Sequence, residues 1–335
     1  MEPLIKIRDL DVTFPVGKSG FFGKPTAYLQ AVSGISLDIN KCETLGLVGE
    51  SGSGKTTLGR AILHLERPTG GKVEIHLNEE YVDLGNLNTK ELRKIWSYMQ
   101  MVFQDPYASL NPRMTVREII AEPLVVNRRG NKEDIFKMVE EVAEMCGLQR
   151  DQLGRYPHAF SGGQRQRIAI ARALALMPQF IVSDEPVSAL DVSIQAQILN
   201  LFKDLQDKLG LTYLFIAHDL ATVAHVCDRV AVMYLGQILE LTETERIFYS
   251  PKHPYTEALM SAIPDIDPDR KMNPVLSSGE RPNPANPPSG CRFHTRCRYV
   301  EPYCKEAQPN QSEIVPGHFV ACHRAESLAL QGAIE

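Results

Sequence analysis

The octapeptide at 49–56 constrains the fold of this chain more than any other stretch. It reads Gly-Glu-Ser-Gly-Ser-Gly-Lys-Thr, which has the G-x-x-x-x-G-K-[ST] spacing of a phosphate-binding loop. Glycines let consecutive backbone N–H groups turn inward around an anion, because no Cβ blocks the turn. A buried strand is predicted before the loop, at 44–48, and a helix after it, at 57–65. This order places phosphates at a helix N-terminus and predicts a nucleoside triphosphate site.

Two side chains of the loop have specific roles in this prediction. Lys55 is expected to reach the β- and γ-phosphates, and the Thr56 hydroxyl is expected to bind Mg²⁺. The alternative is an ordinary surface turn rich in glycine and serine. The nucleotide-binding residues predicted here are Gly49, Glu50, Ser51, Gly52, Ser53, Gly54, Lys55, Thr56 and Thr57.

Length and charge bound the remaining possibilities. A chain of 335 residues fits one large domain, predicted at 1–262, and a small one at 263–335. The net charge of −5 argues against a nucleic-acid partner, because no basic field favours a phosphate backbone. No apolar run is long enough to span a bilayer, and the first residues lack the apolar core of a signal peptide. We therefore expect a cytoplasmic protein, in which structural disulfides are rare.

The apolar patterns predict an α/β fold. Residues 4–14 and 31–39 alternate as half-buried strands do, and with a strand at 73–77 they suggest a small antiparallel sheet. Helical spacing recurs between 116 and 178 and again at 192–209. Because strands alternate with helices, we expect a P-loop core with a mostly parallel sheet and an inserted helical subdomain at about 115–178. The other predicted strands are 99–104, 180–185, 212–217 and a hairpin at 229–241.

Polar side chains follow several of these strands, where the ligands of parallel sheets bind. Asp184 is placed to hold Mg²⁺ through water, and Glu185 to orient and polarise an attacking water. The alternative for this pair is helix capping. Gln104 and His218 also follow strands. The turn Ser161-Gly162-Gly163-Gln164 precedes a helix and is either a second anion site or an ordinary cap. Two phosphate-binding turns on one chain suggest that two chains share each nucleotide.

In chain order, these motifs resemble those of the nucleotide-binding subunits of ABC transporters. The stretches 49–56, Gln104, 161–164, 184–185, 188–191 and His218 are similar to the Walker A, Q-loop, signature, Walker B, D-loop and H-loop motifs. The resemblance covers about 4–250. One departure is Phe160, which stands where the family's signature usually begins with leucine.

The resemblance implies a mechanism. Two cassettes would close head to tail around two ATP molecules, each held between one P-loop and the partner's 161–164 turn. Gln104 would sense Mg²⁺ and the γ-phosphate, His218 would contact the γ-phosphate, and Asp191 would couple the two sites. Phe14 would stack on adenine, with a core phenylalanine as the alternative. Glu185, His218 and Gln104 are the expected catalytic residues, and closure would move membrane subunits that hydrolysis then resets.

Four of the seven cysteines cluster near the C-terminus, after a Pro- and Asn-rich stretch at 264–290 that is read as a linker. Cys291, Cys297, Cys304 and Cys322 are separated by five, six and seventeen residues. In a reducing compartment, clustered thiols point to a metal or cluster site, and four thiolates suit zinc or a [4Fe–4S] cluster. The other three, Cys42, Cys146 and Cys227, are expected to be small core side chains.

The region from His253 through 278–280, 286–288, 291–297 and 320–322 resembles the C-terminal part of dipeptide and oligopeptide importer ATPases, most of all the F-type ATPase of the dipeptide permease. That resemblance favours the iron–sulfur cluster over zinc or no metal. It implies a peripheral protein on the cytoplasmic face of the membrane. The implied partners are a second ATPase subunit in a heterodimer, two membrane permease subunits and an extracytoplasmic binding protein. Nickel, glutathione and oligosaccharide are alternative cargoes, and a soluble ABC ATPase or an exporter is an alternative class.

Overall fold

The computed structural model describes residues 2–17, 26–262 and 280–333 and divides the chain into two compact units. The first unit contains the residues up to Leu4, Ile39–Thr44 and Asn86–Ile216. The second contains Ile5–Asp38, Leu45–Gly85 and the described residues from Ala217 onward. Each unit is built on β-sheet with helices packed on it, so the predicted mixed α/β class is confirmed.

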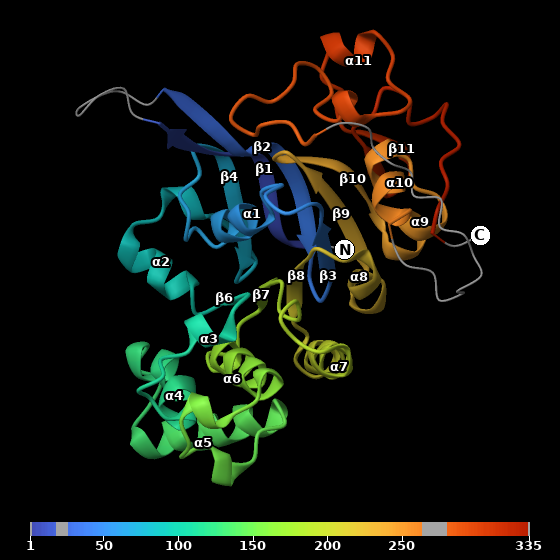
Figure 1. Ribbon diagram of the computed structural model, residues 1–335. Helices are drawn as coiled ribbons and strands as arrows, with labels where there is room; N and C mark the ends of the chain where they lie inside the picture. Colours follow the sequence, from blue (N-terminus) through green and yellow to red (C-terminus); the bar gives the residue numbers. More distant parts are fainter. Residues whose placement is uncertain (1, 18–25, 263–279, 334–335) are drawn as a thin grey trace. The chain divides into compact units, whose positions relative to one another are not determined.

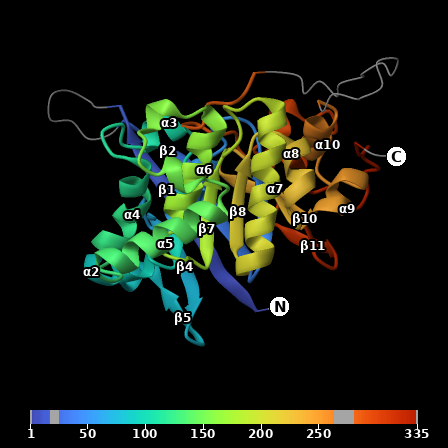
Figure 2. The same ribbon diagram turned by 90° about the horizontal axis from the view of Figure 1, so that it is seen from below.

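Three parallel strands form the centre of the first unit. Strand β7 (Phe180–Asp184) lies between β6 (Met99–Val102) and β8 (Thr212–Ala217), and every residue of β7 and β8 is buried. Helix α6 (Gly162–Leu174) packs on β6, and α7 (Val192–Leu209) packs on β8 through the ring of Phe202. Figure 2 shows α6 and α7 beside these strands. Asp184 ends β7 and His218 directly follows β8, as predicted, whereas β6 ends at Val102, two residues before the predicted end at Gln104.

The helical stretch predicted at 116–178 contains three main helices, drawn in green to yellow-green in Figure 1. Helices α4 (Val116–Val126) and α5 (Lys132–Met145) pack on each other and on α6. Each begins with a capping box, in which the first residue before the helix and the third residue inside it bond to each other's backbone. The shorter elements of this unit are α2 (Thr89–Ile95), α3 (Pro106–Ser109), η2 (Arg150–Gln152) and η3 (Pro157–Ala159).

The second unit contains a four-stranded sheet in the order β2-β1-β4-β5. Strands β1 (Pro3–Val16) and β4 (Gly70–Leu77) pair antiparallel, as do β4 and β5 (Glu80–Asp83), so the predicted antiparallel sheet is confirmed. Strand β2 is Ala27–Asn40. Helix α1 (Lys55–Ile62) and η1 (Leu84–Asn86) complete this part, and Figure 1 shows α1 beside the sheet.

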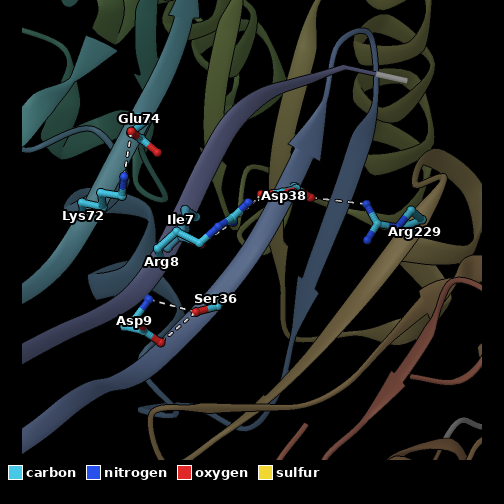
Figure 3. A network of polar contacts seen from close by, with 8 residues as sticks. All are labelled: Ile7, Arg8, Asp9, Ser36, Asp38, Lys72, Glu74 and Arg229. Carbon is cyan, nitrogen blue, oxygen red and sulfur yellow. Dashed lines mark hydrogen bonds and ion pairs between the residues drawn. The ribbon is translucent and has the colours of Figure 1, made fainter. Parts of the chain in front are cut away.

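A polar network fastens the solvent side of this sheet (Figure 3). Arg8 of β1 forms an ion pair of 2.5 Å with Asp38 of β2, and the Asp38 carbonyl accepts from Arg229 at 3.3 Å. Ser36 bonds to both the backbone N–H and the carboxylate of Asp9. Arg8 and Asp38 are more than a third exposed, so their pair contributes about 1 kcal/mol or less to folding. The network therefore fixes strand register more than it adds stability.

The remaining strands of the second unit lie in the order β11-β12-β10-β9-β3. Strand β3 (Thr44–Val48) pairs parallel with β9 (Arg229–Tyr234), which forms the predicted hairpin with β10 (Gln237–Glu243). At its turn, Leu235 and Gly236 have φ of 42° and 83°, the left-handed pair that tight hairpins require. The other elements are α8 (Leu220–Val226), α9 (Thr244–Tyr249), α10 (Pro254–Met260), η4 (His294–Arg296), α11 (Tyr303–Glu306), β11 (Ser312–Val315) and β12 (His318–Val320).

The C-terminal residues join this sheet through a buried pair that the sequence patterns did not predict. Strand β12 pairs antiparallel with β10, and the His318 ring contacts the Glu240 carboxylate at 2.7 Å. Both side chains are buried, and Glu240 also accepts from the backbone N–H groups of Lys252 and His253. The residues after 280 are therefore integrated into the fold of the second unit.

The structure corrects one prediction on the cysteines. Cys42 is exposed in the turn between β2 and β3, with φ of 59°, so its placement in the core was wrong. Cys146 and Cys227 are buried as expected. The predicted linker at 264–290 and the 278–280 motif fall partly on 263–279, which lie outside the described residues, and the domain boundary at 262 stays a prediction. Within the described residues, no helix has the length and apolarity to cross a membrane.

Candidate nucleotide site and cysteine cluster

The phosphate-binding loop follows β3 in the second unit and requires three of its glycines. Gly49, Gly52 and Gly54 have φ of 152°, 70° and 109°, where side chains are strained. A Cβ on Gly49 would lie 2.0 Å from the Met233 carbonyl oxygen, and one on Gly54 would lie 2.1 Å from that of Ala31. The motif therefore reflects close backbone packing as well as ligand access.

Lys55 is buried at the start of α1 and curls back over the loop. Its Nζ donates to the carbonyl oxygens of Gly49 at 2.7 Å and Glu50 at 3.2 Å. This places the ammonium inside the curve of the loop, on the side where a polyphosphate would bind. Thr56 and Thr57 follow on the first turn of the helix.

The hairpin turn at 235–236 supports the loop from one side. The Gly236 N–H donates to the Ser53 carbonyl at 2.8 Å, and its own carbonyl accepts from Ser33 N–H at 2.8 Å. A Cβ on Gly236 would lie 3.0 Å from the Gln30 carbonyl oxygen. Gly236 therefore positions the loop, a role that turn chemistry alone did not indicate.

Two residues from the C-terminal part of the chain hold Glu50. The Glu50 N–H donates to the Tyr255 hydroxyl at 2.9 Å, and the Glu50 carboxylate pairs with Arg296 at 3.0 Å. Arg296 is 13% exposed, and burial raises the pKa of Tyr255 above its usual range. The Glu50 carboxylate is thus held by an arginine, and its role in this pair is structural. No short-range signal in the sequence predicts this pairing.

A cavity of about 510 Å³ opens beside the loop within the second unit. This volume lies in the range of small-molecule sites. Phe14 lines it together with Gly52, Ser53, Gly54 and Thr57, so the predicted adenine-stacking residue and the phosphate-binding residues share one cavity. Residues 281–284 form a further wall.

In the first unit, the predicted catalytic carboxylate contacts the predicted Q-loop residue. Gln104 Nε2 donates to Glu185 Oε2 at 2.8 Å. Glu185 directly follows β7 with φ of 45°, and its N–H donates to the Ile216 carbonyl at 3.0 Å. Asp184, the last residue of β7, is buried. The strained backbone turns Glu185 out of the strand while Asp184 stays inside it.

The predicted signature turn caps α6. Ser161 Oγ accepts from Gln164 N–H at 3.4 Å, and Gln164 Oε1 accepts from Ser161 N–H at 3.1 Å. Ser161 is exposed, whereas Gly163 is buried against α7, where a Cβ would lie 2.4 Å from Ile194 Cγ2. The predicted D-loop residue Asp191 is the residue before α7. The capping alternative is thus realised, and Ser161 itself stays exposed at the start of α6.

The structure brings the predicted residues together in two groups, one in each unit. Phe14 and the loop share a cavity of the second unit, and Gln104 and Glu185 are bonded in the first. His218 belongs to the second unit, where it is exposed just after β8.

All four C-terminal cysteines line one small cavity of the second unit, and His253, His294 and His323 also line it. Burial raises the pKa of Cys291 to about 12 and that of Cys297 to about 11, and the neighbouring thiols add to both shifts. Within the described residues, however, no three His, Cys, Asp or Glu side chains are arranged to hold a single metal ion. The four cysteines of the predicted iron–sulfur cluster therefore line one cavity, but nothing in the structure directly supports the cluster itself.

The sequence comparisons decide the family. A family profile described as "ABC transporter" matches residues 32–188, and one described as "Oligopeptide/dipeptide transporter, C-terminal region" matches 239–304. The chain is 50% identical to the oligopeptide transport ATP-binding protein AppF of Bacillus subtilis, over 96% of this chain and 97% of that protein. The chain belongs to the family of ABC transporter ATP-binding proteins.

This ABC ATPase is also similar to another transport ATP-binding protein and to two solved structures. It is 46% identical to the dipeptide transport ATP-binding protein DppF of Haemophilus influenzae, over 96% of both chains. Its fold is similar to the ATP-binding cassette MJ0796 in a dimeric structure with ADP and Pi, with a TM-score of 0.62, 30% identity, and coverage of 72% of this chain and 98% of that one. It is also similar to cbiO1 from Clostridium perfringens, with a TM-score of 0.62 and 25% identity over 74% of this chain and 91% of that one.

Proposed function

We propose that this ABC ATPase drives a peptide importer. The observation that carries the proposal is the similarity beyond the cassette, because residues 239–304 match the C-terminal region of oligopeptide and dipeptide transporters. Those residues include most of β10 and three of the four clustered cysteines, which are part of the second unit. Near 50% identity over nearly the whole of two peptide transport ATP-binding proteins supports the same cargo class.

In this proposal the P-loop binds ATP and Mg²⁺. Lys55 neutralises the β- and γ-phosphates, the loop N–H groups bind their oxygens, and Thr56 and Asp184 hold the metal. Phe14 stacks on adenine from the wall of the cavity beside the loop. Glu185 is the general base that orients water. Gln104, which donates to Glu185 at 2.8 Å, senses the γ-phosphate and connects it to the helices that follow Gln104 in the chain. His218 contacts the γ-phosphate.

The 161–164 turn would serve a nucleotide on a partner ATPase. Ser161, the residue before a 13-residue helix, is exposed, and a phosphate from outside the chain would reach the helix N-terminus there. The dimeric form of the similar cassette MJ0796 supports this arrangement. Asp191, before α7, would couple the two sites. An isolated chain would then bind ATP weakly and hydrolyse it slowly.

The proposed metal group is a [4Fe–4S] cluster, with zinc as the alternative. The proposal is supported by the four cysteines that line one cavity. In a cluster each thiolate binds a different iron, so the four sulfurs surround a larger space. The cluster would supply structural cross-linking of Cys291, Cys297, Cys304 and Cys322. Iron and sulfide measured after anaerobic purification test this, and colourless protein with stoichiometric zinc would contradict it.

The proposed assembly contains a second, different ATPase subunit, two membrane permease subunits and an extracytoplasmic binding protein, with this chain at the cytoplasmic face. The test is a deletion strain complemented with wild-type chain or with Glu185→Gln. We expect uptake of a labelled oligopeptide to be lost, restored by the wild type and not by the variant. Unchanged peptide uptake, with loss of nickel, glutathione or oligosaccharide uptake instead, would overturn the peptide assignment. Co-purification with nucleic acid and no membrane protein would overturn the importer itself.

A further inference from the structure

The wall of the nucleotide cavity formed by residues 281–284 contains an arginine in contact with the P-loop. Arg281 Nη1 donates to the carbonyl oxygen of Ser51. A Cβ on Gly52 would lie 3.3 Å from both Nη1 and Nη2, so the guanidinium covers that glycine directly. Arg281 lines the cavity together with Phe14 and Gly54. This places a fixed positive charge from the C-terminal part of the chain at the phosphate-binding loop.

Two of the Arg281 donors have no partner. Nε and Nη2 are shielded from solvent and form no hydrogen bond with any described residue. A buried guanidinium N–H without an acceptor is unfavourable, and in native structures such a group usually meets a ligand, an ion or water. The nearby carboxylate of Glu50 is paired with Arg296. Because Arg281 lines the cavity, a molecule bound there would offer acceptors to these two donors.

We propose that Arg281 is a nucleotide-binding residue, which donates Nε and Nη2 to a phosphate or ribose oxygen of ATP. This inference rests on the proposed function of the P-loop. It means that the C-terminal segment described from residue 280 to 333, which contains the four clustered cysteines and is called here the cysteine-containing segment, completes the nucleotide cavity. The cassette part alone then has a lower affinity for ATP. Arginine suits this position because its planar fork offers two parallel donors while Nη1 stays on Ser51.

The test uses isothermal titration calorimetry of the full chain with a non-hydrolysable ATP analogue and Mg²⁺. We expect Arg281→Ala to weaken binding about tenfold or more, because a charge-assisted contact is lost. Arg281→Lys should be intermediate, since an ammonium keeps the charge without the fork. Lys305→Ala is the matched control, because Lys305 is an exposed cation of the same segment outside the cavity, and it should stay within about twofold.

Further arms separate this inference from the proposed function and from misfolding. Lys55→Ala should abolish binding, and a wild-type chain that binds no nucleotide would contradict the proposed function instead. If Arg281 were merely structural, its variants would lower the melting temperature of the free chain but keep the nucleotide-induced rise, whereas a binding role reduces that rise. A loss confined to phosphorylated nucleotides assigns a phosphate oxygen, and an equal loss for adenosine assigns the ribose. Binding by both Arg281 variants equal to that of Lys305→Ala would overturn the inference.

Discussion

Arg292 fastens the cysteine-containing segment to the turn that supports the P-loop. It directly follows Cys291 and is 6% exposed. Its Nη1 donates to the Leu235 carbonyl, and Nη2 donates to Gln30 Oε1 at 2.8 Å and Ser33 Oγ at 2.9 Å. Burial lowers the pKa of Arg292 while the carboxylate of Asp11 raises it. The side chain stays charged, because even a lowered arginine pKa lies far above neutral pH.

Arg292→Ala is expected to destabilise the second unit by about 2–4 kcal/mol. Each hydrogen bond from a charged donor contributes about 1.5–3 kcal/mol, and the buried guanidinium offsets part of that sum through its own desolvation. The assay is urea denaturation followed by circular dichroism. Arg292→Met retains most of the apolar stem without the donors, so the difference between Met and Ala measures packing alone.

The control for charge is Lys305→Ala, whose exposed side chain should change stability by less than about 0.5 kcal/mol. If Arg292→Ala were as stable as this control, the hydrogen bonds to the 235–236 turn would contribute nothing. If Arg292→Met matched the wild type, the stem and not the guanidinium would be what holds the segment.

Three further changes have defined outcomes. Glu185→Gln should abolish phosphate release by the assembled complex while ATP stays bound, and an unchanged steady-state rate would refute the role of Glu185 as base. Gly163→Ala places a methyl group 2.4 Å from Ile194 Cγ2 and should destabilise the α6–α7 contact by about 1–3 kcal/mol, whereas Gly154→Ala, with nothing within 4 Å, should be neutral in the same denaturation assay. Alkylation mapped by mass spectrometry should modify exposed Cys42 quickly and spare Cys146, since burial raises the pKa of Cys146 to about 12; equal labelling would contradict this.

The core strands were predictable because their local chemistry is unambiguous. The runs at 44–48, 180–184 and 212–217 are mostly apolar or β-branched, with Ser183 as a polar exception. They lead into a glycine, a carboxylate and a histidine, and the strands begin and end within one residue of the predictions. Helix α7 was predicted to the residue, since Gly210 ends it with φ of 64°. Long-range tertiary contacts were not needed to define these elements.

Short polar elements and distant pairs were not predictable in the same way. Strand β5 is short and half-buried and helix α2 is largely exposed, so neither carries a strong hydrophobic period, although the capping pair Asn88 and Glu91 marks the start of α2. Cys42 was assigned to the core because cysteine is a common core residue, but the turn at 41–42 exposes it. The contacts of Arg281, Arg292 and Arg296 each span more than fifty residues, and no local pattern specifies such partners.

These arginines change how the P-loop should be understood. The motif appears self-sufficient in the sequence, yet Glu50, Ser51 and Ser53 each bond to a residue between 236 and 296. Two of those partners, Arg281 and Arg296, belong to the segment that carries the cysteines. Glycines at 49, 52 and 54 give the loop freedom to adopt several shapes, so bonds to its other residues select one of them. The C-terminal segment therefore pre-organises the loop, and a change in that segment should be felt first as a change in nucleotide affinity.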